Sequence, residues 1–197
     1  MKKLIFATLM VLLSTGLFAQ EINISASFDA NTTGWFLGEH KMNPSSTISF
    51  NYLGRFQDEA IKLGLGASFW VPRSPEDDSR DITYSNAAVF GILQLYPFRF
   101  SGGNGNIADY FYARANIGYN RPILWGDWVD SSIKSSWGGF YYGLGGGFDT
   151  PVGIFVEFLY NNYKWGATVY GVGDRDGELE TYAIAIGYKF SFGEHKY

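Results

Sequence analysis

Hydrophobic and polar residues alternate along most of this chain, in segments of about ten residues separated by turn-forming residues. The clearest segment runs from 181 to 192, where every even position is aromatic or a branched apolar residue and the odd positions are small or polar. A period of two places the two sets of side chains on opposite faces of a β-strand. The same alternation occurs in segments 47–56, 61–71 and 110–120.

The spacing of these segments predicts an all-β protein of about eight antiparallel strands, connected in an up-and-down meander. The first strand is expected to be irregular, because residues 29–33 interrupt its alternation. The predicted strands are Glu21–Leu37, Thr47–Phe56, Ile61–Val71, Ile82–Phe98, Tyr110–Arg121, Gly138–Asp149, Ile154–Trp165 and Leu179–Phe192.

The two faces of these strands favour a transmembrane β-barrel over a soluble sandwich. The polar faces are rich in small residues and glycine and carry one or two charges each, whereas solvated faces are usually rich in Lys and Glu. The apolar faces end in Tyr, Trp or Phe, as the aromatic girdles of a membrane barrel require. The alternative is a soluble ligand-binding β-barrel, which would purify without detergent.

The connections alternate in length, which is typical of a membrane barrel with its N-terminus in the periplasm. Short turns are predicted at Gln57–Ala60 and Thr150–Gly153, and the Gly- and Asn-rich connection Ser101–Asp109 is longer than a minimal turn. The longer loops on the opposite side are predicted at Pro72–Asp81, Ile123–Trp137 and Gly171–Leu179.

Residues 1–19 have the order of a secretory signal peptide. Lys2 and Lys3 form a basic start, Leu4–Leu13 is an apolar run, and small residues lead to Ala19, after which we expect cleavage. The alternative, a membrane helix, needs a longer apolar run. The prediction is therefore a signal peptide over 1–19 and one barrel domain over 20–197.

The composition agrees with this interpretation. The chain has 197 residues, of which 19% are aromatic and 17% charged, and its mean hydropathy is only −0.08. Its net charge of −4 argues against a nucleic-acid partner, which would need a basic face. Cysteine is absent, so the sequence provides neither disulfides nor thiolate ligands.

Three segments of the sequence resemble a known family. These are Tyr96-Pro97-Phe98, the strand Tyr110–Tyr119 and the closing strand Tyr182–Phe192. They resemble the small bacterial outer-membrane β-barrel domains, of the OmpA transmembrane-domain type within the porin-like superfamily. The resemblance implies a monomer in the outer membrane of a Gram-negative cell, in contact with lipid and lipopolysaccharide. It also implies insertion by the barrel-assembly machinery, with either Phe192 or Tyr197 as the terminal aromatic signal.

Five charged residues are predicted to point into the barrel lumen, with Gln94 as a further candidate. An eight-stranded barrel has an interior that side chains fill, and a charge there has to be paired or hydrated. We therefore hypothesise that Glu157 pairs with Arg114 or a neighbouring cation. The network either plugs the lumen, which is favoured, or gates a narrow ion path. The five predicted lumen charges are Arg55, Lys62, Arg114, Glu157 and Lys189.

The sequence predicts no cofactor and no metal site. Gly143–Gly147 lacks the Lys-Ser or Lys-Thr of a phosphate-binding loop, and Asp174–Glu178 has only half the ligands of a calcium loop. Pro75–Asp78 is acidic and is interpreted as a solvated loop, with a divalent-ion site as the alternative. The two histidines, His40 and His195, lie far apart in the sequence.

The prediction for function is a non-enzymatic outer-membrane barrel with a structural or surface-interaction role. A narrow passive channel or a transporter of small hydrophobic ligands is the alternative. A lipid-modifying enzyme is less favoured, because no acid is placed to orient His40 toward Ser45 or Ser46. The tryptophans of the long loop extend the aromatic girdle or bind a partner; they are Trp125, Trp128 and Trp137.

Overall fold

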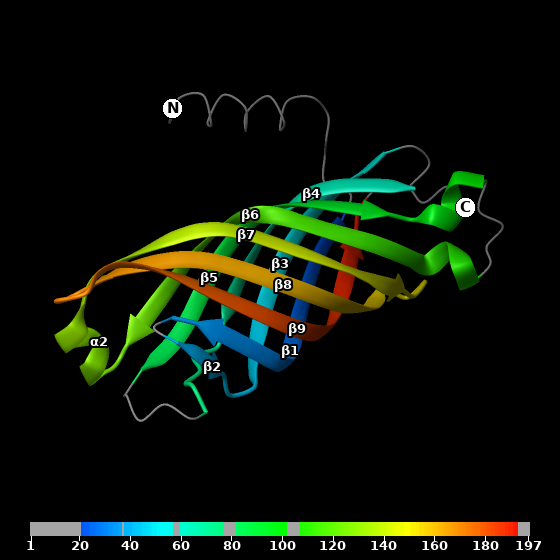
Figure 1. Cartoon of the computed structure of the whole chain (residues 1–197). Helices are drawn as coiled ribbons and strands as arrows, with labels where there is room; N and C mark the ends of the chain where they lie inside the picture. The colour runs from blue at the N-terminus through cyan, green and yellow to red at the C-terminus, as the bar shows by residue number, and fades with distance from the viewer. Residues whose placement is uncertain (1–20, 37, 57–59, 77–81, 102–106, 193–197) are drawn as a thin grey trace, which may run out of the picture.

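The protein is a closed ring of antiparallel strands (Figure 1). The computed structural model describes residues 21–36, 38–56, 60–76, 82–101 and 107–192. Eight long strands pair in chain order, and the last pairs with the first, which confirms the predicted up-and-down barrel. They are β1 (Glu21–Trp35), β3 (Ser45–Phe56), β4 (Ile61–Trp70), β5 (Thr83–Leu95), β6 (Phe111–Trp125), β7 (Ile133–Asp149), β8 (Ile154–Val169) and β9 (Gly173–Ser191).

The ring closes between β1 and β9, whose pairing runs from Glu21 opposite Ser191 to Trp35 opposite Glu178. The register shifts between Asp29 and Asn31, which is the irregularity that the sequence predicted for this strand. The short strand β2 (Glu39–Lys41) pairs with the end of β1 and lies outside the ring. Both ends of the described chain therefore lie at one end of the barrel, called here the terminal end; the opposite end is called the distal end.

Short helices lie at both ends of the barrel. The 3-10 helices η1 (Pro97–Ser101) and η2 (Ile107–Tyr110) connect β5 to β6 at the terminal end, and α2 (Asp127–Ser132) connects β6 to β7 at the distal end. In the part of the chain that the structure describes, no helix is long and apolar enough to span a bilayer.

The outward faces of the strands form an apolar belt between two rows of aromatic rings. The distal row includes Tyr142, Tyr160 and Tyr182, whose neighbouring ring centroids are 6.1 Å and 5.3 Å apart. The terminal row includes Tyr188 and Phe190, at 4.8 Å. Tyr182 and Phe190 are eight steps apart on β9. At about 3.4 Å per step and a tilt near 40°, the belt is roughly 20 Å tall, close to the apolar band of outer-membrane barrels.

Alternation places the side chains as predicted on the four segments with the clearest pattern. On β9, Ile184 and Ile186 are 48% and 60% exposed, whereas Ala183 and Ala185 between them are buried. The same contrast separates Leu63 and Leu65 from the buried Lys62 on β4. Large apolar side chains are thus exposed where lipid would cover them.

Two predicted loops are wrong, because the strands continue beyond the belt. Residues 123–137, predicted as one loop, comprise the end of β6, α2 and the start of β7. Residues 171–179 were also predicted as a loop, but β9 begins at Gly173 and the turn before it is short, with Gly171 at φ 74° and Gly173 at φ 88°. The Gly- and Asp-rich composition of this strand resembles a loop because its side chains are exposed.

Other predicted boundaries fit more closely. β5 ends at Leu95 rather than at Phe98, because Pro97 cannot donate to a ladder and starts η1 instead. The turn Thr150–Gly153 is confirmed: the Gly153 N–H donates to the Thr150 carbonyl at 3.0 Å. Residues outside the described ranges include the predicted signal peptide, Tyr197, most of the turn 57–60, and parts of the loops 72–81 and 101–109.

Asn120 holds the barrel wall together where pairing between β6 and β7 ends. The last paired residues are Asn120 and Gly139, and β7 is bulged against β8 at the same level. The Asn120 side-chain amide donates to the carbonyls of Gly139, Phe140 and Lys164 at 2.9–3.2 Å. One buried amide thus binds carbonyls of three residues that the register of β7 with β8 skips at the bulge.

Candidate functional site in the barrel lumen

The structure places all five predicted charges on the inward faces of their strands. Lys62, Arg114 and Glu157 are buried, and the side chains of Arg55 and Lys189 are 10% and 13% exposed. They do not form one network. They belong to two clusters at different depths in the lumen, and a third cluster lies nearer the distal end.

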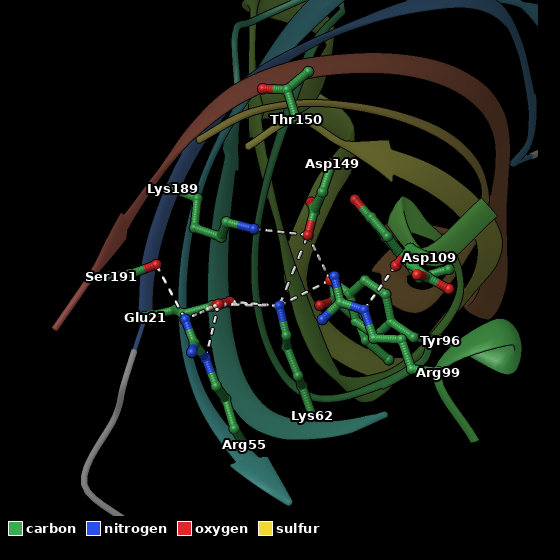
Figure 2. A network of polar contacts seen from close by, with 12 residues as sticks. Glu21, Arg55, Lys62, Tyr96, Arg99, Asp109, Asp149, Thr150, Lys189 and Ser191 are labelled. Atoms are coloured by element: carbon green, nitrogen blue, oxygen red, sulfur yellow. Dashed lines mark hydrogen bonds and ion pairs between the residues drawn. The ribbon is translucent and has the colours of Figure 1, made fainter. Parts of the chain in front are cut away.

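Glu21 is the centre of the cluster at the terminal end (Figure 2). It is the first residue of β1, and its buried carboxylate accepts from Arg55 of β3 at 2.7 Å and from Lys62 of β4 at 2.9 Å. The Arg55 guanidinium also donates to the Ser191 hydroxyl at 3.2 Å. Glu21 therefore ties the start of the barrel to β3 and to β4, the strand after it, and, through Arg55, to the last strand.

Asp149 forms the second half of this terminal cluster. It accepts from Lys189 and from the Tyr96 hydroxyl, both at 2.7 Å, and lies 3.8 Å from Lys62. Lys62 in turn donates to the Tyr96 oxygen at 2.8 Å. Burial and the negative charge of Asp149 raise the pKa of Tyr96 well above its usual value, so Tyr96 stays a neutral donor. Figure 2 shows how Lys62 lies between Glu21 and Asp149.

A pocket of about 320 Å³, called here the mouth pocket, opens at this end of the barrel. Lys62 and Glu21 lie at its base, and the turn 150–153 forms part of its rim. Arg99 of η1 lies at the same opening, where it donates to the Asp109 backbone carbonyl at 2.7 Å and packs over the Tyr96 ring. The other lining residues are Arg55, Tyr110, Tyr188, Lys189 and Ser191.

The second cluster is built on the ion pair that the sequence suggested. Arg114 of β6 donates to both oxygens of Glu157 on β8, at 2.7 Å and 3.0 Å. The Tyr112 hydroxyl donates to the same carboxylate at 2.8 Å, and the Gln94 amide lies 3.5 Å away. The rest of the Arg114 guanidinium donates to the Asn116 and Asn51 side-chain oxygens.

The third cluster was not predicted. Arg73 lies beyond the end of β4, and its guanidinium reaches back into the lumen to pair with Asp29 of β1 and to donate to Thr32 at 2.8 Å. The same guanidinium packs 4.2 Å from the centre of the Trp70 ring. All four side chains are buried. This cluster ties the 71–76 connection to the barrel interior.

Aromatic side chains fill the lumen between and beyond these clusters, which corrects the expectation that inward residues are small. Tyr141 and Tyr163 stack at 4.7 Å, and Trp70 and Phe90 contact them. Nearer the distal end, Phe36, Trp165, Ala167 and Val169 form a separate apolar cluster. Among the described residues, the cavity at mid-lumen holds only about 20 Å³, enough for a water molecule.

Four charged residues of these clusters were missed, for different reasons. Glu21 and Asp29 share the inward face of β1. The alternation of residues 21–29 contains this information, but the interruption at 29–33 makes the whole strand look irregular. Asp149 is an even number of residues from the buried Tyr141 on β7, so the alternation of this strand could have assigned it to the inward face. Arg73 gave no such signal, because it lies outside any long strand and its side chain returns to the lumen.

The other candidate residues have ordinary structural surroundings. The Ser45 hydroxyl donates to the Val71 carbonyl at 2.8 Å. Trp128 packs against the distal apolar cluster, whereas Trp125 and Trp137 are 41% and 37% exposed. Within the described ranges, no group of three or more His, Cys, Asp or Glu side chains could hold a metal ion.

Comparison with solved structures decides the type of barrel. Neisserial surface protein A aligns with a TM-score of 0.59 and 12% identity, over 86% of this chain and 97% of the other. The Ail protein of Yersinia pestis aligns at 0.51 and 15%, over 87% and 99%. OprG of Pseudomonas aeruginosa aligns at 0.50 and 17%, over 90% and 99%.

The chain has the fold of the small outer-membrane β-barrels. Models of known protein families and curated protein sequences give no match. At these identities the likeness extends to the fold and to no particular activity. The lumen clusters are therefore interpreted from their own geometry.

Proposed function

We propose that this protein is an integral outer-membrane barrel without enzymatic activity, which serves as a structural or surface-interaction protein. The observation that carries the proposal is the combination of an outward apolar belt between aromatic girdles with a lumen filled by ion pairs and stacked aromatic rings. A belt of this kind is stable in lipid, whereas in water it would promote aggregation. The filled lumen supports a role other than the passage of solutes.

In this proposal, residues 1–19 are removed as a signal peptide, the terminal end faces the periplasm and the distal end faces outward. Outer-membrane lipid, lipopolysaccharide and the barrel-assembly machinery are the expected partners of a monomer. The exposed Phe192 directly follows the last residue of β9, Ser191, which supports Phe192 as the aromatic signal that the machinery reads.

The distal end supports the surface-interaction role. β7, β8 and β9 continue beyond the girdle, and there the inward side chains of β8 pack with Phe36 and Trp128 into an apolar cluster of their own. Figure 1 shows this extension together with α2. A packed extension presents a fixed surface rather than a set of separate loops. Ail, which shares the fold, is by its name an attachment and invasion protein, in agreement with such a role.

Cell fractionation, followed by electrophoresis of boiled and unboiled samples, tests the location. We expect the protein in the outer-membrane fraction, as a folded band whose mobility changes on boiling. Recovery as a soluble protein would contradict the proposal and favour the soluble ligand-binding barrel.

Planar-bilayer recording separates the structural role from the alternative, a narrow channel or a transporter of small hydrophobic ligands. The filled lumen predicts no steady conductance from the refolded protein. Regular unitary openings would favour the channel.

A third assay addresses the enzyme alternative. It compares the lipid A species of cells that make the protein with those of cells that make His40→Ala. Identical profiles are expected, and a difference would favour the enzyme.

A further inference from the structure

Trp137 lies on the outward wall of the barrel, well beyond the distal girdle. On β7 it is paired with Gly166 of β8, which is six residues along β8 from Tyr160 of the girdle. At about 3.4 Å per residue and a tilt near 40°, this separation is roughly 15 Å. The exposed Lys164 and its cross-strand neighbour Glu178 lie on the same wall between the two levels. Charged side chains are costly within lipid, so the girdle ends before Trp137.

The indole of Trp137 lies with one face on Gly166. A Cβ atom added at Gly166 would stand 2.4–2.6 Å from three adjoining ring atoms, Cε2, Cζ2 and Nε1. Nearly equal distances to adjoining atoms mean that the strand meets the ring at its face and not at its edge. Trp137 is nonetheless 37% exposed, so the opposite face of the indole is turned outward. The missing side chain at Gly166 thus lets a flat aromatic surface lie against the wall.

The groups beside this surface supply both an acceptor and a donor of hydrogen bonds. Asp176 of β9 is directly opposite Gly166, on the side away from Trp137. Lys164 precedes Gly166 by two residues on β8, so it projects from the same face of the strand. Both side chains are exposed, and no hydrogen bond or ion pair joins either of them to another residue that the structure describes.

We propose that Trp137 is the platform of a saccharide-binding site, with Asp176 and Lys164 as its hydrogen-bonding groups. A pyranose ring presents a face of C–H groups that packs on an indole. Its hydroxyls project around the rim, where they can donate to the Asp176 carboxylate and accept from the Lys164 ammonium. A cationic ligand would be attracted by the indole and by Asp176 but repelled by Lys164. A neutral ring with hydroxyls uses all three groups.

The position of the site assigns the saccharide to the lipopolysaccharide of the surrounding leaflet. This assignment rests on the proposed function, in which the distal end faces outward. Figure 1 shows β7, β8 and β9 continuing side by side into the extension, and Trp137 lies on the wall of this extension, not on the turn 170–172 at its tip. Sugars attached to the neighbouring lipids lie beside this wall, whereas a glycan on another cell would meet the tip first.

The first test titrates the folded protein with core oligosaccharide, released from lipopolysaccharide by mild acid, in a polyoxyethylene detergent that carries no sugar. Nitrogen-15 labelling of tryptophan gives one indole N–H signal for each of the six tryptophans, and Trp137→Phe assigns the signal of Trp137. We expect this signal to shift saturably. The signal of Trp125, which is 41% exposed at the end of β6, should stay in place. Absence of a saturable shift, or an equal shift of both signals, would overturn the proposal.

Calorimetric titration of variants tests the platform itself. Trp137→Leu should weaken binding roughly tenfold or more, whereas Trp137→Phe keeps an aromatic face and should lose less. Gly166→Ala retains the indole but pushes it off the strand, and should also weaken binding. Trp125→Leu is the matched control and should bind like the parent. Parental affinity in a Trp137→Leu protein that is folded, as judged by gel mobility of unboiled samples, would contradict the site.

Asp176 separates a saccharide from a cation as the ligand. Asp176→Asn keeps an acceptor oxygen without the charge, so binding of the oligosaccharide should fall only about threefold. Asp176→Ala removes the acceptor and should weaken binding roughly fivefold to tenfold. A saturable shift of the Trp137 signal with choline, and none with the oligosaccharide, would replace the saccharide site by a cation site.

Maltohexaose, titrated in the same way, tests the assignment to lipopolysaccharide. We expect it to bind more weakly than the core oligosaccharide; equal or tighter binding would contradict the assignment. These titrations need only the folded barrel in detergent, so their failure does not bear on its proposed location. Recovery of the protein as a soluble protein in cell fractionation would instead remove the lipopolysaccharide assignment without changing any titration.

Discussion

Arg114 and Glu157 make a two-oxygen contact in the middle of the lumen, with one guanidinium nitrogen 2.7 Å and 3.0 Å from the two carboxylate oxygens. Both side chains are buried, the Tyr112 hydroxyl donates to the Glu157 oxygen that is nearer to Arg114, and the Asn116 side-chain oxygen accepts from Arg114 Nε. An ion pair with this many supporting bonds has few alternative partners. We therefore interpret it as a fixed crosslink between β6 and β8 that closes the lumen.

Removing one member of this pair should destabilise the barrel. Glu157→Gln leaves the Arg114 charge buried without a carboxylate, which should lower the free energy of unfolding by about 3–5 kcal/mol. The double variant Arg114→Met with Glu157→Gln should recover part of this loss, because no unpaired charge remains. Urea unfolding in lipid vesicles, followed by tryptophan fluorescence, measures both.

The same variants distinguish a plug from a gate. A plug predicts lower stability for Glu157→Gln and no regular openings in bilayer recordings. Unchanged stability together with new unitary openings would identify the pair as a gate. If neither property changes, both interpretations of Glu157 are wrong.

Asn120 should matter more than its place in a strand suggests. Asn120→Ala removes the amide that binds three backbone carbonyls, at an expected cost of about 1–3 kcal/mol. Asn120→Asp should cost more, because a carboxylate can only accept and would face three other acceptors. Asn43→Ala, at an exposed position, is the control. Faster hydrogen exchange in β7 should accompany the loss; equal stability of Asn120→Ala and the control would contradict this role.

Trp70 should contribute much of the packing inside the lumen. Its ring contacts Tyr163 at 4.6 Å and the Arg73 guanidinium at 4.2 Å, and it is 1% exposed. Trp70→Ala should therefore cost about 3–5 kcal/mol in urea unfolding. Trp125→Ala, which truncates a half-exposed ring, should cost much less. Comparable effects of the two truncations would mean that the lumen is not tightly packed.

A charge on the belt should be costly only if lipid covers it. Ile184 lies on β9 within the belt, and Ile184→Arg should lower the stability of the vesicle-inserted protein by about 2–4 kcal/mol. Val172→Arg, in the β8–β9 turn, should be nearly neutral. A soluble barrel predicts small effects for both variants, because water would surround both positions.

The sequence was sufficient to predict the fold because apolar and polar side chains alternate with a period of two along each strand. On β9, five outward side chains from Tyr182 to Phe190 alternate with small or polar inward ones, and this alternation fixes the buried face whatever the neighbouring strands are. Prediction was poorest where strands leave the belt. There both faces of β9 become polar or glycine-rich, and in the described structure residues 173–177 pair with β8 and not with β1.

The lumen was predicted only in part, for a related reason. Alternation assigns Lys62 and Glu157 to the interior, but it contains no information on which charges meet across the ring. Arg114 and Glu157 are two strands apart in the ring, and Lys62 bonds to Glu21 because β1 lies two strands from β4. Those partners depend on the closure of the barrel and on its stagger, which no local pattern encodes.

The most direct test of the account is the accessibility of single cysteines, since the natural chain has none. We would introduce Ile184→Cys in the belt and Val172→Cys in the distal turn, and treat intact cells with a membrane-impermeant thiol reagent. The account predicts that Val172→Cys is labelled and that Ile184→Cys is labelled only after the membrane is dissolved and the protein unfolded. Labelling of Ile184→Cys in the folded protein without detergent would show that water, and not lipid, covers the apolar belt.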